Sequence, residues 1–579
     1  MTTLLKLYLL FSKSEKKNAI LLLFLILIGV VLETFSIGLI FPLVNTLLQP
    51  DDFYKNEIIE VFNLQELDNT DLILILFLML VAVYFIKGIF LAFLAWRQHL
   101  FVFGLKRKLS IKLFKKYIEQ PYIFHVNKNS SEFVRNIMFE VNHLSSSAMD
   151  LLILISELCV VLSISVLLIY LEPTGAFVVI LFVGIAGAVF YQLVKAYILD
   201  WGQKRQYHDF YRLKHLNQGL HGIKDVKVLR REDSFIGEFS KHNTESVRVA
   251  RNASFLSSLP RLWLEFVVVL GLFLLVFFMS VSGMGVNQIV AKLALFAAAA
   301  FRLLPSFNRI LSTLQALRYS VPVINVIYQE FMLPKKAKNI NSVSPLNKSI
   351  KLKNLSYRYG IHEKEVLKGI NLEILKGQKV GFIGTTGSGK STAVDIILGL
   401  LQPSEGSVSV DEFSIGKGSD NWTRQIGYVP QDIYLTDDTL EKNIAFGVEE
   451  KNIDREKINN VIQKAELNAL VLSSELGLHI NVGEEGSALS GGEKQRIGIA
   501  RALYNDPAII ILDEATSSLD IKTEKKIMET IFKLKDKTIV IIAHRLSTVE
   551  NCDSIYQFEK GKISKKSVKK VSIPKQETL

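Results

Sequence analysis

Cysteine is scarce in this sequence, and its scarcity excludes two classes of protein. The 579 residues include two cysteines, Cys159 and Cys552. Two thiols cannot build the disulfide framework of a small secreted domain, nor a metal site made of clustered cysteines. Internal repeats and low-complexity tracts are also lacking. The apolar start at residues 4–11 is short and has no small-residue cleavage site after it, so we expect the first long apolar run to remain as an uncleaved anchor.

Long apolar runs, in contrast, are abundant before residue 330. Hydrophobic residues make up 49% of the chain. Six runs approach or exceed the length that crosses a bilayer, at residues 19–44, 72–96, 151–171, 176–199, 261–279 and 289–304. A single run is also compatible with a buried core helix, but six of them predict a helical transmembrane domain. The last run is the weakest, because it carries Lys292 and Arg302.

The segments between these runs differ in charge, which predicts their orientation. The N-terminus carries Lys6, Lys13, Lys16 and Lys17, and residues 97–128 and 204–251 are also basic, whereas residues 51–68 are acidic. By the positive-inside rule, both termini and the C-terminal half are cytoplasmic. Much of the net charge of +12 then follows from membrane topology, and nucleic acid is not expected as a partner.

The C-terminal half contains a phosphate-binding loop. Its pattern G-x-x-x-x-G-K-S/T is matched at every fixed position by Gly384, Thr385, Thr386, Gly387, Ser388, Gly389, Lys390 and Ser391. We expect a strand before the loop at residues 380–383 and a helix after it, from Thr392 to residue 401. In that context the loop N–H groups and the helix N-terminus surround phosphate oxygens, Lys390 reaches the β- and γ-phosphates of a nucleotide, and Ser391 ligates Mg²⁺.

Two carboxylates follow an apolar run further along the chain. Asp513 and Glu514 come directly after residues 509–512, so we expect them at the carboxyl end of a buried strand, where α/β sheets bind ligands. Asp513 suits the Mg²⁺ shell, and Glu514 suits a general base for the attacking water. A strand that ends in a solvated acidic turn is the alternative.

A second glycine-containing segment resembles another phosphate cradle. Ser490, Gly491, Gly492 and Glu493 precede a stretch with helical spacing, so their N–H groups are expected at a helix N-terminus. Since the chain has one phosphate-binding loop, this second cradle needs a phosphate from elsewhere. The simplest arrangement is two copies facing head to tail, in which the cradle of each copy closes on the nucleotide of the other.

Together these motifs resemble the ATP-binding cassette (ABC) ATPases over about residues 350–565. The motifs that occur in the family's order are Tyr359, the loop at 384–391, Gln431, the signature at 489–493, Asp513 with Glu514, the turn at 518–520 and His544. The resemblance implies that Tyr359 stacks on adenine, Gln431 senses Mg²⁺ and His544 senses the γ-phosphate, while Asp520 communicates across the dimer interface. The alternatives are that Tyr359 packs inside a strand, that Gln431 is a solvated loop glutamine and that His544 is a structural histidine.

Glu493 departs from this family, which commonly has glutamine at the end of its signature. We expect the acid to act on ATP affinity or closure and not to abolish activity, because Glu514 and His544 are both present.

The whole chain then resembles an ABC exporter of the half-transporter type. The predicted fold class is a six-helix transmembrane domain followed by an α/β phosphate-loop ATPase domain. The expected divisions are a transmembrane domain at 1–333, a linker at 334–349, the ATPase at 350–565 and a basic tail at 566–579. Coupling helices are expected near residues 120–133 and 210–223. A homodimer is the simpler assembly, since every ATP-site motif lies in one chain, and a heterodimer is the alternative.

Basic residues within or beside the apolar runs are candidate substrate ligands. They are Lys87, Arg261, Arg302 and Arg309, and intramembrane charges often mark functional sites. The alternatives are snorkelling to the interface or local pairing, such as Arg261 with Glu265. The outer segment around residues 53–67 is either a short amphipathic helix on the membrane surface or a plain acidic loop.

These details resemble the bacterial ABC flippase for lipid-linked oligosaccharides in protein N-glycosylation. The similar runs are residues 260–265 and 301–309, with Lys87 in a place where an arginine is expected. The resemblance implies a polyprenyl-pyrophosphate-linked oligosaccharide as cargo, ATP and Mg²⁺ as cofactors, and the bacterial inner membrane as location. The alternative cargoes are a lipid A-type lipid, a drug or a peptide.

Overall fold

The computed structural model describes residues 3–39, 69–171, 173–281, 286–334, 345–360, 363–415, 420–516, 518–534, 536–543 and 545–566. The chain divides into two compact units. Unit 1 contains Met1–Gln120 and Asn127–Lys335, and unit 2 contains Pro121–Val126 and Lys336–Leu579. The predicted outer segment at 53–67, most of the expected linker, and nearly all of the basic tail lie outside the described residues.

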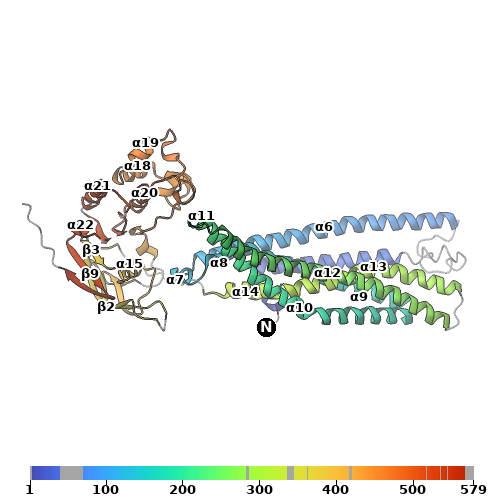
Figure 1. Cartoon of the computed structure of the whole chain (residues 1–579). Helices are drawn as coiled ribbons and strands as arrows, with labels where there is room; N and C mark the ends of the chain where they lie inside the picture. Colours follow the sequence, from blue (N-terminus) through green and yellow to red (C-terminus); the bar gives the residue numbers. More distant parts are fainter. Residues whose placement is uncertain are drawn as a thin grey trace, which may run out of the picture. The chain divides into compact units, whose positions relative to one another are not determined.

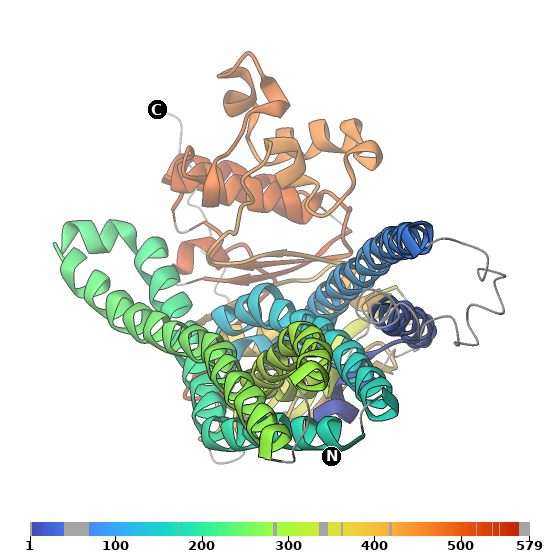
Figure 2. The same cartoon turned by 90° about the vertical axis from the view of Figure 1, so that its right-hand side faces the viewer.

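Unit 1 is a bundle of long helices (Figures 1 and 2). Its helices are α1 (Thr3–Leu10), α2 (Lys13–Gly38), α6 (Asn69–Ile118), α8 (Ser130–Arg135), α9 (Val141–Leu171), α10 (Pro173–His221), α11 (Ile223–Val228), α12 (Glu232–Val281), α13 (Val286–Tyr319) and α14 (Val321–Met332), with a π-helical turn between α8 and α9. Five of the six predicted apolar runs lie within α6, α9, α10, α12 and α13, one run on each helix, and residues 19–38 of the first run lie on α2.

Five of the described helices are long and apolar enough to cross a bilayer. A sixth span is reached if Leu303–Tyr319 and Val321–Met332, which are bent by 47° at their junction, are counted together. The bundle exposes large apolar side chains, such as Phe24 at 60%, Phe85 at 69% and Phe266 at 60%. Such a surface is expected of helices that face lipid hydrocarbon.

The transmembrane helices pack through two apolar cores. Ile26, Leu94, Ile164 and Leu303 belong to one core, which joins α2, α6, α9 and α13. A smaller core joins α10, α12 and α13 around Leu264 and neighbouring side chains. The long helices therefore form one bundle in which α13 contributes to both cores.

Unit 2 is an α/β domain built around two sheets (Figure 1). The strands are β1 (Ser349–Tyr357), β2 (Leu367–Leu375), β3 (Lys379–Gly384), β4 (Glu405–Val410), β5 (Phe413–Ser414), β6 (Ile426–Val429), β7 (Ile509–Asp513), β8 (Thr538–Ile542), β9 (Ser554–Glu559) and β10 (Lys562–Lys566). The helices are α7 (Tyr122–Val126), α15 (Lys390–Ile397), α16 (Asp420–Thr423), α17 (Leu440–Ile444), α18 (Arg455–Lys464), α19 (Asn468–Leu472), α20 (Gly491–Leu503), α21 (Ile521–Phe532) and α22 (Leu546–Val549).

The larger sheet has the order β10-β9-β3-β8-β7-β6, and β3, β6, β7, β8 and β9 are parallel. Every residue of β7 and β8 is buried, as expected for parallel strands covered on both faces. Ile510 and Leu512 enter one core, and Ile509 and Ile511 enter the other. This sheet places the ends of β3 and β7, and hence the nucleotide motifs, at the same edge. The smaller antiparallel sheet has the order β2-β1-β4-β5.

Helix α7 is a segment of the N-terminal half that belongs to unit 2. Its Ile123 packs against the core beneath β1 and α15. Burial raises the pKa of the Tyr122 phenol, and the nearby Asp395 carboxylate and Tyr359 phenol raise it further. The structure thus has short helices within the predicted coupling segment at 120–133. In the second predicted coupling segment, residues 210–221 continue α10, and a short helix, α11, begins at Ile223.

Candidate functional site: a nucleotide site in unit 2 and basic residues in unit 1

The phosphate-binding loop connects β3 to α15, as the sequence predicts, and α15 begins at Lys390. Gly384 has a φ of 150°, and a Cβ there would lie 2.3 Å from the Phe558 carbonyl oxygen. Gly389 caps α15 with a φ of 105°. Glycine is required at these two positions because a side chain would collide with backbone or adopt a strained conformation.

Polar groups of the loop point toward its interior. The Lys390 ammonium, in a residue that is 5% exposed, donates to the carbonyl oxygens of Gly384 at 2.8 Å and Thr385 at 3.1 Å. The buried Ser388 hydroxyl has no hydrogen-bond partner among the described residues. Tyr359, 40% exposed, contacts Thr392 through their hydroxyl oxygens at 3.3 Å. The contact with Thr392 places Tyr359, the residue predicted to stack on adenine, beside the first turn of α15.

The two predicted carboxylates follow β7 in the expected way. Asp513 is 6% exposed at the end of the strand. Glu514 has a φ of 52°, a left-handed conformation that is uncommon for residues other than glycine, and its N–H donates to the Ile542 carbonyl oxygen at 3.1 Å. This backbone reversal separates the two neighbouring side chains. A residue held in this way at a strand end is typical of functional sites.

Electrostatic interactions show that these groups are neighbours. Burial lowers the pKa of Lys390, and the charges of Glu514 and Asp513 oppose that shift. Burial raises the pKa of Asp395 to about 6, with a further contribution from Asp513. Burial and the Asp513 charge also raise the pKa of the Tyr428 phenol. One lysine and several carboxylates therefore meet at the edge where β3 and β7 end.

The signature segment forms the N-terminus of α20. Ser490 is the cap residue, and its hydroxyl accepts from the Glu493 N–H at 3.3 Å. One Glu493 carboxylate oxygen accepts from the Ser490 N–H at 2.8 Å and from the Ser490 hydroxyl at 2.7 Å. Burial acts to raise the pKa of Glu493, but these bonds and the Arg496 charge outweigh it, so the pKa lies below its usual value. Glu493 therefore completes a capping box.

The turn after β7 packs against this signature segment. A Cβ on Gly491 would contact the Ser518 side chain at 3.4 Å, and a Cβ on Gly492 would contact Leu519 at 3.4 Å. Asp520 caps α21 by accepting from the Thr523 N–H at 2.9 Å, and hydrogen bonds from the side chain and the backbone of Thr523 lower its pKa. The structure thus brings the signature and the Asp520 turn together within one copy.

The remaining predicted residues of the ATP site have different positions. Ser391 is exposed at the start of α15, and Gln431 is exposed on the bend that follows β6. His544 lies outside the described residues. The sequence-based roles of these three residues stay predictions.

Three of the four candidate substrate cations lie beside carboxylates. The Lys87 ammonium, on α6, is 3.6 Å from a Glu33 carboxylate oxygen on α2 and donates to the Ser36 hydroxyl at 3.2 Å. Arg261 on α12 donates to Glu265 at 2.9 Å, which is the local pairing that its spacing allowed. Lys87 is largely buried, whereas 71% of the Arg261 side chain is exposed.

Arg309 has a long-range partner that the sequence did not reveal. Its guanidinium on α13 donates to Glu157 of α9 at 2.7 Å, and the Ser306 hydroxyl donates to the other Glu157 oxygen at 2.6 Å. The Glu157 side chain is 6% exposed, whereas 58% of the Arg309 side chain is exposed. Arg302 lies on the same helix, and its side chain is outside the described part of the chain.

Comparison with known proteins identifies both units. The family described as ABC transporter matches residues 367–517, and the ABC transporter transmembrane region matches residues 18–303. The chain belongs to the ABC transporters. It is an exporter-type half-transporter, with transmembrane helices followed by an ATPase that couples ATP hydrolysis to transport.

Several relatives of this transporter can be named. It is 26% identical to the lipid A-core flippase of Cupriavidus pinatubonensis over 474 residues, 79% of this chain and 78% of that protein. It is 40% identical to the leukotoxin translocation ATP-binding protein LktB of Mannheimia glucosida over 224 residues, 38% of this chain and 31% of that protein. A bacterial Atm1-family ABC exporter, solved with ATP bound, shares the fold with a TM-score of 0.81, at 20% identity over 96% of this chain and 95% of that one.

The loop of this ABC transporter fits the phosphates of ATP. Its glycine backbone leaves no room for a Cβ at Gly384, and its buried Ser388 hydroxyl is available to a ligand. Ser391, Asp513 and Gln431 carry a hydroxyl, a carboxylate and an amide, and oxygen atoms of these kinds are the ligands that Mg²⁺ prefers. The donor set therefore fits a nucleotide with its magnesium ion.

Proposed function

We propose that this transporter moves an amphipathic lipid with an anionic head group across a bacterial inner membrane, and that a polyprenyl-pyrophosphate-linked oligosaccharide is the first candidate cargo. The observation that carries the proposal is Arg309, an arginine among apolar helices that is paired with Glu157 yet keeps 58% of its side chain exposed. A guanidinium with free donors suits bidentate binding of phosphate oxygens.

An apolar pocket lined by the helices that carry Arg261 and Arg309 supports an amphipathic cargo. It is lined by Leu264 and Val267 of α12 and by Leu303 and Phe307 of α13, among others. Leu264 is one helical turn from Arg261, and Phe307 is two residues from Arg309. The same two helices therefore carry both the apolar lining and the basic residues, which suits a cargo with an apolar tail and an anionic head group.

The ATP site supplies the driving reaction in this proposal. Lys390 would hold the β- and γ-phosphates, and Ser391, Asp513 and Gln431 would hold Mg²⁺, which would neutralise phosphate charge. Glu514 is the general base that accepts a proton from the attacking water, and His544 contacts the γ-phosphate. Tyr359 stacks on adenine.

Two copies complete the site. The Ser490–Glu493 cradle of each copy faces the nucleotide of the other, and Asp520 lies at the same interface. A homodimer supplies both cradles, because each chain carries the full set of motifs. Binding of ATP closes the pair, and hydrolysis reopens it. The termini and the ATPase lie in the cytoplasm.

A lipid A-type cargo is the second candidate. It is favoured by the named lipid A-core flippases, which resemble this chain over 79% of its length. The named leukotoxin translocator, in contrast, matches over 38%. Both candidate lipids carry phosphate, so the basic residues alone do not separate them.

The test is translocation in proteoliposomes that contain the transporter and one candidate lipid at a time. We expect ATP-dependent loss of polyprenyl-pyrophosphate oligosaccharide from the outer leaflet of inside-out vesicles, measured by accessibility to a soluble enzyme. Glu514→Gln should abolish it while nucleotide still binds. Translocation of lipid A and not of the polyprenyl lipid would make lipid A the cargo in place of the first candidate. Glu514-dependent hydrolysis without translocation of either lipid would refute the proposal that the cargo is an anionic lipid.

The Arg309 pair can be tested separately from the cargo. Arg309→Ala should slow transport of the anionic lipid more than tenfold. The substitution also leaves the buried Glu157 carboxylate without its arginine partner. Adding Glu157→Gln removes that unpaired charge, so the double variant should recover thermal stability but not transport. Recovery of both would show that Arg309 acts through the fold alone.

A further inference from the structure

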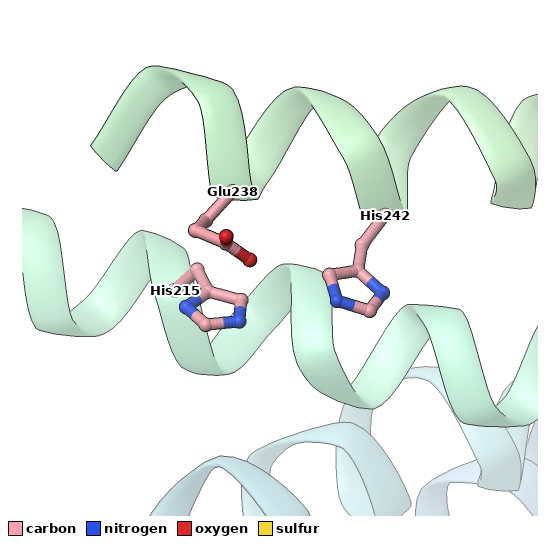
Figure 3. Close-up of side chains that lie close together, drawn as sticks. All are labelled: His215, Glu238 and His242. Atoms are coloured by element: carbon pink, nitrogen blue, oxygen red, sulfur yellow. The ribbon is translucent and has the colours of Figure 1, made fainter. Parts of the chain in front are cut away.

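Three side chains that suit a metal ion lie together on two helices of unit 1, remote in sequence from the ATP motifs. His215 extends from α10, and Glu238 and His242 extend from α12 (Figure 3). One ligand atom from each lies within 4.8 Å of the other two. Since Glu238 and His242 are four residues apart, they occupy one face of α12, directed toward α10.

The distances are close to those of a coordination shell. Zinc lies about 2.0–2.1 Å from histidine nitrogen and about 2.0–2.2 Å from carboxylate oxygen, so tetrahedral ligands are about 3.4 Å apart. The His215 ring already stacks on the His242 ring with centroids 5.5 Å apart. Glu238 is exposed, so its long side chain can rotate toward the two rings and shorten the remaining distances. The third ligand, His242, is 7% exposed and supplies a fixed point.

Neighbouring aromatic groups hold the His242 ring in place. Its Nδ1 is 3.0 Å from the Nδ1 of His208, and it stacks on Tyr211 with ring centroids 4.9 Å apart. The contact with His208 leaves Nε2 of His242 available to an ion. Metal-binding histidines commonly have their second ring nitrogen held in this way, which fixes the ring orientation. His208 is therefore a positioning residue.

We propose that His215, Glu238 and His242 bind a divalent transition-metal ion, with water as the fourth ligand, and that the ion ties α10 to α12. Two imidazoles and one carboxylate favour zinc and similar ions over Mg²⁺ or Ca²⁺, which prefer a shell made of oxygen ligands. The ion stabilises the ends of the two helices that are joined through α11, where the chain reverses direction.

The site is tested by titrating the full-length transporter, purified without a polyhistidine tag and held in lipid nanodiscs, with Zn²⁺ under isothermal calorimetry. We expect one ion per protomer with a micromolar or tighter dissociation constant, and a rise in the thermal unfolding midpoint. His215→Ala and His242→Ala should each weaken binding more than tenfold, and Glu238→Gln should weaken it by about fivefold. Mg²⁺ at the same concentration should bind elsewhere without competing.

A matched control is present on the same helix. His221 is exposed at the end of α10, and its ring contacts the Asn217 carbonyl oxygen of its own helix, so His221→Ala should bind Zn²⁺ as the unaltered protein does. Co²⁺ gives a second readout, since a four-coordinate shell produces strong visible absorption that His215→Ala should lose. Absence of stoichiometric binding, or equal binding by the His215→Ala and His242→Ala variants, overturns the proposal. The proposal is also overturned if His221→Ala weakens Zn²⁺ binding as much as His215→Ala and His242→Ala do.

Discussion

Replacement of Glu493 separates two roles for the acid at the end of the signature. In the structure its carboxylate accepts two hydrogen bonds from Ser490 and completes the cap of α20. Glutamine at this position has a carbonyl oxygen that accepts the same bonds, whereas alanine has none. We therefore expect Glu493→Gln to be mild and Glu493→Ala to be damaging.

The magnitudes follow from the energetics of helix caps. Replacement of an N-cap residue costs about 0.5–2 kcal/mol and typically about 1 kcal/mol. Glu493→Ala removes the reciprocal half of the capping box while the Ser490 hydroxyl still accepts from the N–H of residue 493, so we expect a cost of about 1 kcal/mol. Because the cap orients the N–H groups of the signature, we expect the closed, hydrolytic state to be destabilised by the same free energy. A cost of about 1.4 kcal/mol is about tenfold in rate, so Glu493→Ala should lower kcat/KM for ATP about five- to tenfold. Glu493→Gln should stay within about twofold.

The assay is steady-state ATP hydrolysis by the full-length transporter in nanodiscs, paired with thermal unfolding. Asp454→Ala is the matched control, because Asp454 caps α18 by accepting from the Glu456 and Lys457 N–H groups. Its removal should lower stability by a similar amount while hydrolysis stays unchanged. Equal damage from Glu493→Gln and Glu493→Ala, or a shifted KM without any change in stability, would show that the charge of Glu493 acts on the nucleotide and not on the cap.

Three further outcomes are expected. Gly384→Ala should abolish binding of a fluorescent ATP analogue, because its Cβ would collide with the Phe558 carbonyl oxygen, whereas Gly387→Ala meets nothing within 4 Å among the described residues and should cost about 1–2 kcal/mol of left-handed strain. Burial raises the pKa of the Asp395 carboxyl in the folded protein to about 6. Its neutral form therefore contributes stability at acid pH that is lost as the pH rises through about 6. Asp395→Asn should therefore increase the free energy of unfolding more at pH 8 than at pH 5, by roughly 2–3 kcal/mol at pH 8, and an equal increase at both pH values would contradict the raised pKa. Ile123→Asp should leave basal hydrolysis within about twofold yet stop its stimulation by lipid cargo, because it disturbs the core contact of α7; unchanged stimulation would refute coupling through α7.

The ATPase fold could be predicted because its chemistry is encoded locally. The loop from Gly384 to Ser391 and the strand before Asp513 are short continuous segments, and the structure has β3, α15 and β7 where the sequence predicts them. Most of the membrane-spanning runs could be predicted for the same reason, since five of the six are predominantly apolar stretches that each lie within one helix.

The contacts between distant segments could not be predicted. Glu157 and Arg309 are 152 positions apart, and no local pattern marks the pair. His215 and His242 come from different helices without a ligand-spacing motif. The sequence favours a role of Glu493 in ATP affinity or closure, whereas the structure places its side chain in a capping box. The spacing of Ser490 and Glu493, three residues apart, is the local signal for that cap.

The membership of α7 in unit 2 has a practical consequence for dissecting this protein. An ATPase fragment that starts after the linker lacks residues 121–126, although they are part of that compact unit. Such a fragment would uncover the apolar surface that Ile123 now covers, and exposed apolar surface promotes self-association. A soluble fragment should therefore be made by supplying the 121–126 segment through a short fused linker. Likewise, a chimera that exchanges the ATPase between two transporters should exchange this segment with it.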